Sequence, residues 1–383
     1  MDYFEEKLYK IKENDCFRSI KNITAKDEKF VFLNGKKLLN LSSNNYLGVA
    51  DNQKNLKEFL KSQDELYSLG SASARLLSAN LPVYDELERT VAGLYNKQKA
   101  LLFNTGYQAN LGLISALSNS DTMFLADKLV HASMLDGLKL NKANFARYNH
   151  LDYEQLEELL KKYSPKYKNI YIVSESVFSM DGDIADLKKL CELKEKYSAK
   201  IILDEAHAFG VFGPNALGIA EQDGLIDKID IIIATFGKAI GSMGAFIVSD
   251  TAIIDYLINT ARSFIFSTAL PPMNIAFSLW VIKNILPNTL EQRTAMLQNA
   301  DRLRDNLINN GFNTLGSSQI VPVILGKSSL ALETAEYLQT KGFFVLPVRP
   351  PSVKENSSRL RISLTTQVNE NDIVELSEIL IYS

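Results

Sequence analysis

Short apolar runs alternate with amphipathic segments through the middle of this 383-residue chain. The apolar runs are rich in Ile, Leu, Val and Phe, as is typical of strands buried on both faces of a sheet. The segments between them repeat apolar residues every three or four positions, as in 152–163, which is the pattern of an amphipathic helix. This alternation predicts an α/β fold with a mostly parallel sheet and helices on both of its faces. The expected strands are 99–103, 123–126, 144–147, 170–173, 201–203 and 229–234, and the helices between them are 106–117, 131–140, 152–163 and 186–197.

The pattern changes toward both ends of the chain. A helix is expected at 2–12, and the apolar runs that flank Asn34-Gly35 predict a hairpin. Beyond residue 282, helices and strands mix as in a smaller α+β domain, with helices at 293–310 and 329–341, strands at 319–324 and 359–364, and a last helix from about 369. Because the chain is longer than one core usually grows, we expect an N-terminal segment (1–45), a large domain (46–282) and a small C-terminal domain (283–383).

The composition excludes some classes of protein. The 42 basic and 45 acidic residues nearly balance, so the chain offers no basic field for nucleic acid. Two cysteines are too few for a disulfide framework or a thiolate metal site, and together with a charged N-terminus they favour a cytoplasmic protein without metal. The uncharged stretch 263–282 contains Pro271-Pro272, so we expect a buried loop and a core helix there and no membrane span.

Polar side chains follow two of the expected strands. Lys238 lies in the turn after 229–234, and Asp204 and His207 lie directly after 201–203. In an open α/β sheet, ligands bind at the carboxyl ends of the strands. A lysine that is partly removed from water has a lowered pKa, which makes its amine a good nucleophile toward a carbonyl carbon. Lys238 is therefore a candidate Schiff-base lysine.

A third strand end predicts an anion site. Strand 99–103 leads through Asn104-Thr105 into a helix that starts at Gly106 and Tyr107, and the first amides of a helix attract phosphate. Pyridoxal 5′-phosphate would satisfy both the lysine and the anion site, with Asp204 stabilising its ring nitrogen and His131 stacking on its ring. Each histidine taken alone could equally be a hydrogen-bonded structural residue.

Several longer motifs occur in the same order as in a known family. They are SNNYLG at 43–48, NTGYQAN at 104–110, DKLVHASMLDG at 127–137, SESVFSMDGD at 174–183, DEAHAFGVFG at 204–213, TFGKAIGSMG at 235–244, FSTALPP at 266–272 and RLRISLT at 359–365. With them, the chain resembles the α-oxoamine synthases, which are pyridoxal-phosphate enzymes of fold type I. The resemblance extends from about residue 18 to the C-terminus.

The resemblance implies a role for each matching residue. Lys238 would hold the cofactor and transfer the proton, with Asp204, His207 and His131 completing the catalytic set. Ser179 and His207 would contact the oxygen side of the ring, and Gly106, Tyr107 and Thr235 the phosphate. Ser267 and Thr268 would reach the phosphate of the other subunit, which implies a homodimer with shared sites. Arg361 would bind the amino-acid carboxylate, while Arg18, Asn44 and Ser352 would line the substrate pocket.

The family's substrates are an amino acid and an acyl thioester. The compact length and the TGYQAN and TFGKAIGSMG motifs are most similar to the 8-amino-7-oxononanoate branch, which uses L-alanine and a pimeloyl thioester carried by coenzyme A or a carrier protein. A glycine C-acetyltransferase, a plain transaminase and an inactive regulatory homologue stay open as alternatives. Two departures from the family pattern, GSASAR at 70–75 and Tyr84, could alter the acyl pocket.

Overall fold

The computed structural model of the protein describes residues 2–64 and 67–381. The chain forms two compact units. The sheet unit comprises residues 53–178 and 184–290, and the terminal unit comprises 1–52, 179–183 and 291–383. The first 52 residues therefore join the C-terminal part of the chain, whereas the sequence analysis expected an N-terminal segment of its own ending at residue 45. The short loop 179–183 interrupts the sheet unit and belongs to the terminal unit.

A seven-stranded sheet organises the sheet unit. Its strand order is β4-β10-β9-β8-β7-β5-β6. Neighbouring strands from β9 to β6 are parallel, and β10 is antiparallel to both β4 and β9. The strands are β4 (Lys99–Phe103), β5 (Thr122–Asp127), β6 (Asn144–Tyr148), β7 (Asn169–Glu175), β8 (Lys200–Asp204), β9 (Ile231–Thr235) and β10 (Ala245–Ser249). The predicted mostly parallel α/β sheet is confirmed.

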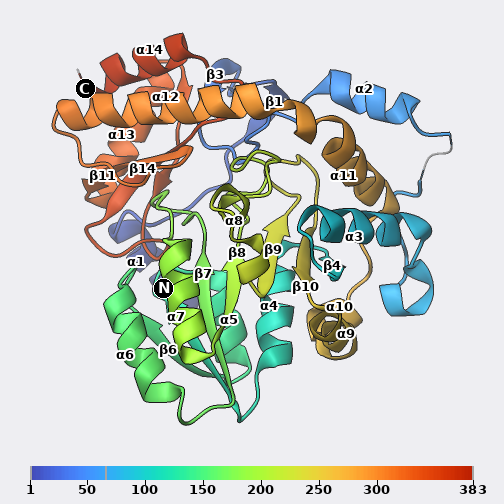
Figure 1. Cartoon of the computed structure of the whole chain (residues 1–383). Helices are drawn as coiled ribbons and strands as arrows, with labels where there is room; N and C mark the ends of the chain where they lie inside the picture. Colours follow the sequence, from blue (N-terminus) through green and yellow to red (C-terminus); the bar gives the residue numbers. More distant parts are fainter. Residues whose placement is uncertain (1, 65–66, 382–383) are drawn as a thin grey trace. The chain divides into compact units, whose positions relative to one another are not determined.

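Helices cover both faces of this sheet. Helices α4 (Gly106–Leu117) and α5 (Ala132–Leu140) lie on one face, and α6 (Tyr153–Tyr163) and α7 (Leu187–Tyr197) lie on the other (Figure 1). This arrangement follows from right-handed crossovers, since the chain moves across the sheet in opposite directions before and after β6. The helix starts are fixed locally, because Thr105, Asp152 and Asp186 accept hydrogen bonds from backbone N–H groups of α4, α6 and α7.

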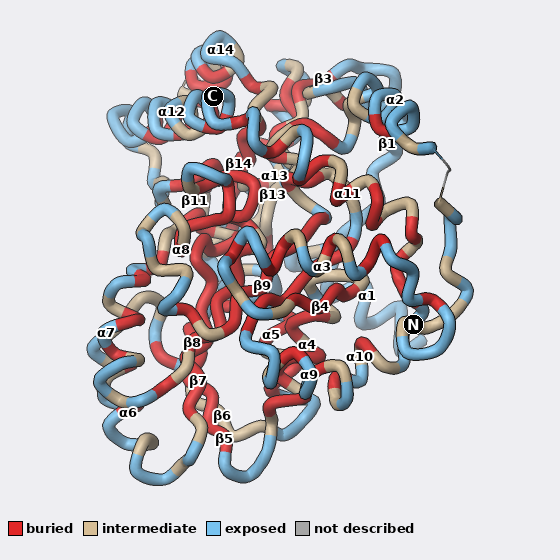
Figure 2. Tube along the Cα trace, turned by 45° about the vertical axis from the view of Figure 1, so that its right-hand side comes forward, coloured by how far each residue is buried: buried red, intermediate tan, exposed pale blue. Residues whose placement is uncertain are grey.

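The other helices of the sheet unit are α2 (Gln53–Lys61), η1 (Arg75–Ala79), α3 (Pro82–Leu94), α8 (Ile219–Gln222), η2 (Ile226–Lys228), α9 (Thr251–Thr260), α10 (Arg262–Ile265), α11 (Pro272–Asn284) and η3 (Leu286–Asn288). Helix α3 begins at Pro82, since proline fits the first turn of a helix. The strands form the core, and Figure 2 shows their buried traces surrounded by helices with exposed outer faces. Burial on both sides explains why these strands read as continuous apolar runs.

The terminal unit contains two small sheets. Strands β1 (Ile23–Asp27), β2 (Phe30–Leu33), β3 (Lys36–Asn40) and β12 (Phe343–Phe344) form one, and β11 (Ile320–Gly326), β14 (Ser358–Ser363) and β13 (Pro347–Val348) form the other. Its helices are α1 (Tyr3–Glu13), α12 (Leu290–Asn309), α13 (Ser328–Thr340) and α14 (Glu370–Ile381). The predicted hairpin is confirmed, and Asn34 and Gly35 both have the positive φ that its turn requires.

Several elements were not predicted. Strand β10 and helix α9 follow the lysine turn, and α2 and β1 lie in stretches where apolar residues show no clear periodicity. The pairing of β3 with β12 joins residues about 300 positions apart in the chain, which no local pattern encodes. The uncharged stretch 263–282 forms the end of α10, a loop and most of α11. The predicted core helix is confirmed, whereas the loop is only partly buried, since Phe266 and Thr268 are exposed. Within residues 2–64 and 67–381, the longest apolar helices fall short of what a membrane crossing needs.

Candidate active site

Three neighbouring strands bring two carboxyl groups and one amine to the same end of the sheet. Asp204 is the last residue of β8, and the register pairs it with Glu175 at the end of β7 and with Ile233 of β9. Asp204 is 6 % exposed and Glu175 is 3 % exposed. The turn that carries Lys238 follows β9, and Lys238 is half-buried there. The predicted meeting of strand ends is therefore present.

Asp204 is held by two hydrogen bonds. Its Oδ2 accepts from Asn110 Nδ2 at 2.9 Å, and its Oδ1 accepts from the Ala206 backbone N–H at 2.8 Å. Asn110 lies on α4, is buried, and also donates to Ser133 Oγ on α5 at 3.0 Å. Both carboxyl oxygens of Asp204 therefore accept a hydrogen bond, and these two donors fix the orientation of the group. The sequence analysis gave Asn110 no role, although an amide on the buried face of an otherwise apolar helix was a usable signal.

His131 lies at the start of α5 and interacts electrostatically with both Asp204 and Lys238. Its Nδ1 is 2.7 Å from Ser133 Oγ, which fixes the orientation of the ring. Although the residue is exposed as a whole, the surrounding protein desolvates the ring and lowers its pKa. Asp204 opposes this shift and Lys238 adds to it. The structure thus brings together His131, Asp204 and Lys238, and presents a neutral, open aromatic ring beside the carboxylate and the amine.

Glu175 is a second residue that the sequence analysis missed. Burial raises its pKa well above the usual range, the nearby charge of Asp204 raises it further, and Lys238 and a backbone hydrogen bond from His131 lower it. Among the described residues, its Oε1 has no hydrogen-bond partner. Burial and the neighbouring Asp204 thus both favour the protonated form of Glu175, which reduces the repulsion between two carboxyl groups at one buried edge.

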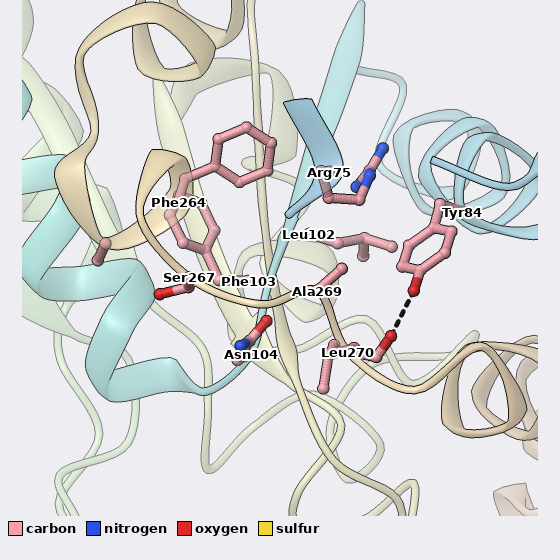
Figure 3. Close-up of a pocket in the computed structure, with 10 residues that line it drawn as sticks. Arg75, Tyr84, Leu102, Phe103, Asn104, Phe264, Ser267, Ala269 and Leu270 are labelled. Carbon is pink, nitrogen blue, oxygen red and sulfur yellow. Dashed lines mark hydrogen bonds between the residues drawn. The ribbon is translucent and has the colours of Figure 1, made fainter. Parts of the chain in front are cut away.

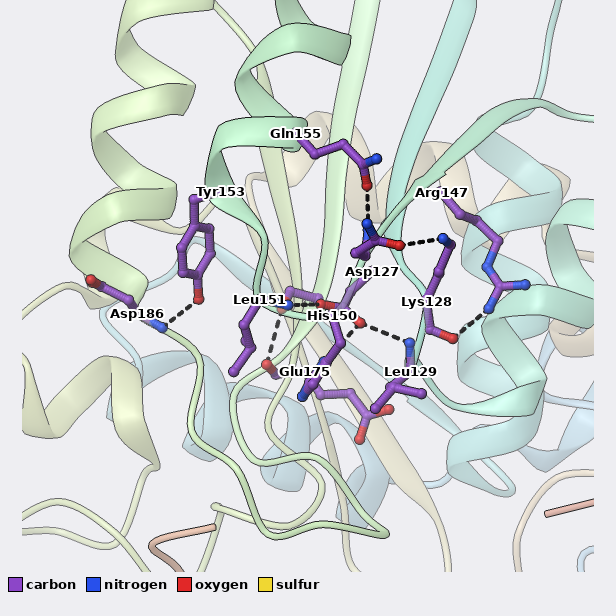
Figure 4. Close-up of polar contacts among 12 residues, drawn as sticks. Asp127, Lys128, Leu129, Arg147, His150, Leu151, Tyr153, Gln155, Glu175 and Asp186 are labelled. Atoms are coloured by element: carbon purple, nitrogen blue, oxygen red, sulfur yellow. Dashed lines mark hydrogen bonds and ion pairs between the residues drawn. The ribbon is translucent and has the colours of Figure 1, made fainter. Parts of the chain in front are cut away.

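A separate polar network lies next to Glu175 (Figure 4). The fully buried carboxylate of Asp127 accepts from the backbone N–H groups of Leu129 at 2.7 Å and Leu151 at 2.9 Å, and lies 3.0 Å from His150 Nδ1. His150 packs edge-on against Phe178. This histidine therefore joins β5 to the loop after β6.

The start of α4 is the place where the sequence analysis predicts an anion site. A Cβ added to Gly106 would meet no atom closer than Thr235 Cβ at 3.8 Å, so there is open space beside the first turn. Tyr107 is exposed, and its hydroxyl donates to Asp136. Thr235 Oγ1 donates to Gly244 O at 2.8 Å and accepts from Gly237 N–H at 3.1 Å. The single hydrogen of the Thr235 hydroxyl is used in the bond to the Gly244 carbonyl, which positions the lysine turn. To donate to a phosphate, Thr235 would have to give up that bond.

Two further predicted cofactor residues lie near this helix start. Gln108 of α4 donates to Ser267 Oγ at 3.3 Å, and Asn104 donates to the Thr268 carbonyl at 2.6 Å. His207 is buried, three residues after Asp204. The contacts predicted for these three residues with a cofactor stay predictions.

The predicted substrate residues lie in the terminal unit. Arg361 of β14 donates to Asn44 Oδ1 at 3.1 Å, to Ser363 Oγ at 2.6 Å and to the Ser179 carbonyl at 2.5 Å. Burial raises the pKa of the Tyr46 hydroxyl, and the charge of Arg361 opposes that rise. The predicted residues Arg361, Asn44 and Ser179 are thus in direct contact with one another.

Arg18 and Ser352 form a second group in the terminal unit. Arg18 donates to the carbonyls of Arg349 at 3.2 Å and Pro350 at 3.1 Å, and to Ser352 Oγ at 3.4 Å. Arg18 also lines a cavity of about 340 Å³ together with Phe17, Leu332 and Leu346. A cationic group beside apolar walls suits an acyl chain that bears an anionic group.

The family of the chain follows from comparison with known proteins. The family model for aminotransferase class I and II matches residues 36–380. The chain belongs to the aminotransferase class I and II family. It is 43% identical over 373 residues to the 8-amino-7-oxononanoate synthase of Chlorobaculum parvum, which covers 96% of this chain and 95% of that protein.

Solved structures give the same assignment within this aminotransferase family. Serine palmitoyltransferase from S. paucimobilis with bound PLP matches with a TM-score of 0.89 and 29% identity, covering 100% of this chain and 96% of that chain. The 8-amino-7-oxononanoate synthase from Francisella tularensis matches with a TM-score of 0.77 and 29% identity, covering 90% of this chain and 97% of that one. The predicted membership of the α-oxoamine synthases, with their fold type I architecture, is confirmed.

The residues of the sheet unit fit the cofactor of these aminotransferase relatives. The space beside Gly106 can take a phosphate at a helix start, and the open ring of His131 can take a stacked aromatic ring. Asp204 is buried and hydrogen-bonded as a carboxylate that can pair with a protonated ring nitrogen. Among the described residues, no group of three or more His, Cys, Asp or Glu side chains has the arrangement of a metal site.

Proposed function

We propose that this acyltransferase condenses L-alanine with a pimeloyl thioester to give 8-amino-7-oxononanoate, carbon dioxide and a free thiol, in the biosynthesis of biotin. The observation that carries the proposal is the full-length similarity to an 8-amino-7-oxononanoate synthase together with the cluster of Asp204, His131 and Lys238. The cofactor is pyridoxal 5′-phosphate, which when bound withdraws electrons from the α-carbon of the amino acid. The acyl carrier is coenzyme A or a carrier protein.

Each residue of the sheet unit has a defined task in this proposal. Lys238 Nζ would hold the cofactor, and as a free amine it would take the proton from the α-carbon of the amino acid. Asp204 would face the ring nitrogen and favour its protonated form, with the hydrogen bond from Asn110 holding the carboxyl group in place. His131 covers one face of the ring and, being neutral, adds no charge against the protonated nitrogen. His207 is assigned to the phenolic oxygen of the ring, as is Ser179, which belongs to the terminal unit.

The terminal unit supplies substrate binding. Arg361 binds the carboxylate of the amino acid, and its contacts with Asn44 and the Ser179 carbonyl hold the guanidinium in place beforehand. Arg18 and Ser352 line the acyl side. The α-carbon then attacks the thioester carbonyl, the thiol leaves, and the amino-acid carboxylate departs as carbon dioxide. We also propose a homodimer in which Ser267 and Thr268 reach the phosphate site of the partner subunit.

A product assay tests the reaction. Purified protein with pyridoxal phosphate is given L-alanine or glycine, each with pimeloyl or acetyl thioester, while released thiol and carbon dioxide are measured. We expect both products with L-alanine and pimeloyl thioester. Turnover with glycine and acetyl thioester alone would instead identify a glycine C-acetyltransferase, and amino transfer without carbon dioxide would identify a transaminase.

Substitution of the lysine tests the assignment of the amine. Lys238→Ala should remove both the visible absorption of the bound cofactor and turnover. Lys188→Ala, at an exposed lysine on α7, should change neither. A Lys238→Ala variant that keeps its absorption band and its activity would place the covalent bond elsewhere.

A further inference from the structure

The segment 267–270 lies in the connection between α10 and α11 and forms no helix or strand of its own. Three side chains hold three successive carbonyls of this stretch. Asn104 Nδ2 donates to the Thr268 carbonyl at 2.6 Å, Ser71 Oγ donates to the Ala269 carbonyl at 2.6 Å, and the Tyr84 hydroxyl donates to the Leu270 carbonyl. The position of the segment is thus set by side chains from three other parts of the sheet unit.

Exposure differs along this segment. Ala269 and Leu270 are buried, Ser267 is half-buried and Thr268 is exposed. The backbone N–H of Ala269 also donates to the Ser73 carbonyl at 2.9 Å. The buried half of the segment is therefore anchored, while the residues that carry the two hydroxyl groups are presented at the surface of the unit.

Tyr84 is itself rigidly placed. It is 1 % exposed, and the guanidinium of Arg75 lies over its ring at 4.7 Å (Figure 3). Both carboxylate oxygens of Glu88 accept from Arg75, at 2.9 and 3.1 Å, and Glu88 Oε1 also accepts from the Leu102 N–H of β4 at 2.9 Å. A planar guanidinium held by a carboxylate and stacked on an aromatic ring leaves that ring little freedom.

We infer that Tyr84, Ser71 and Asn104 are positioning residues that fix the hydroxyl groups of Ser267 and Thr268 for the cofactor phosphate of the partner subunit. The inference rests on the proposed function, which assigns those two hydroxyls to the phosphate. Donors that are already in place when the ligand arrives lose less entropy on binding, so loosening the segment weakens phosphate binding without touching the phosphate itself.

The two departures from the family pattern both lie against this segment. The first departure, GSASAR at 70–75, bonds the segment through the Ser71 hydroxyl and the Ser73 carbonyl. The second, Tyr84, bonds it through its hydroxyl. Their effect is therefore on the placement of Ser267 and Thr268.

The test compares two aldehydes that differ by the phosphate group. The dissociation constants of pyridoxal phosphate and of pyridoxal are measured by titration of the visible band in wild-type protein, Tyr84→Phe and Tyr95→Phe. Tyr95 is the matched control, because it is fully buried and its hydroxyl donates to the Leu217 carbonyl at 2.6 Å, away from the segment. Each variant loses one buried hydrogen bond from a tyrosine to a carbonyl and keeps its ring.

We expect Tyr84→Phe to weaken pyridoxal phosphate about tenfold, the factor for about 1.4 kcal/mol, and to leave pyridoxal within about twofold. Ser71→Ala should act in the same direction, and Tyr95→Phe should keep the wild-type ratio of the two constants. If Tyr84→Phe and Ser71→Ala both keep that ratio, the positioning role is refuted. Wild-type protein that forms no band with either aldehyde would instead refute the proposed function, and the positioning role with it.

Discussion

Glu205 is a buried acid whose ionisation should make the stability of the fold depend on pH. It directly follows Asp204 and has no exposed surface. Its carboxyl group accepts from the Ser176 hydroxyl, from Ile219 N–H at 3.2 Å and from Ala220 N–H at 2.8 Å. Burial nevertheless outweighs these bonds and raises the pKa of Glu205 to about 7, and the charge of Asp204 contributes in the same direction.

The sign of the effect follows from the direction of the shift. A raised pKa means that the folded protein binds the proton more tightly than the unfolded chain, so the stabilisation is complete below the ordinary pKa of 4.5 and is lost as pH rises through about 7. At 1.36 kcal/mol per pKa unit, the full shift corresponds to about 3 kcal/mol. Between about pH 5 and about pH 8, proton linkage at this one group should lower the free energy of unfolding by about 2.5 kcal/mol.

The perturbation that isolates this group is Glu205→Gln. The amide leaves one backbone N–H without an acceptor, which costs about 1–3 kcal/mol at every pH. That constant cost cancels when only the change with pH is compared. Urea unfolding of both proteins, followed by circular dichroism from about pH 5 to about pH 8, should show the difference between them shifting by about 2.5 kcal/mol in favour of the variant. A difference that stays flat over this range would mean that Glu205 is ionised throughout, and that its hydrogen bonds outweigh burial.

Three further predictions concern the two units. Asn110→Leu removes a hydrogen-bond donor from the Asp204 carboxylate, so kcat/KM should fall about tenfold to a hundredfold while the circular dichroism spectrum stays the same. An unchanged kcat/KM would exclude a role for Asn110 in placing Asp204. Arg359→Met leaves the Asp181 carboxylate buried without its ion pair, which should lower the free energy of unfolding in urea by about 3–5 kcal/mol. Asp181→Leu in the same chain should largely restore the lost stability, and no rescue would argue against the pair as the cause. Arg361→Lys keeps the charge but loses the planar contacts, so KM for the amino acid should rise about tenfold with the dissociation constant of pyridoxal phosphate unchanged, whereas equal losses would make its role structural.

The sequence by itself determined six of the seven strands of the large sheet, the helices α4 to α7 between them and the polar residues that follow the strands. Periodicity is a local property, and a lysine or aspartate at the end of an apolar run can be recognised from a few neighbouring residues. Asp204 and Lys238 were found in this way, and the helix start at Gly106 followed from one strand and one turn. The longer motifs then identified the family.

The tertiary structure alone decided which groups surround those residues. Asn110 reaches Asp204 across 94 positions of the chain, and Glu175 meets it through the register of two strands. The same holds for the pairing of β3 with β12 and for Tyr84, whose hydroxyl bonds a carbonyl 186 positions away. Such contacts depend on the packing of elements that are distant in sequence. A hydrogen bond also needs its atoms placed within a few tenths of an ångström, which no local pattern specifies.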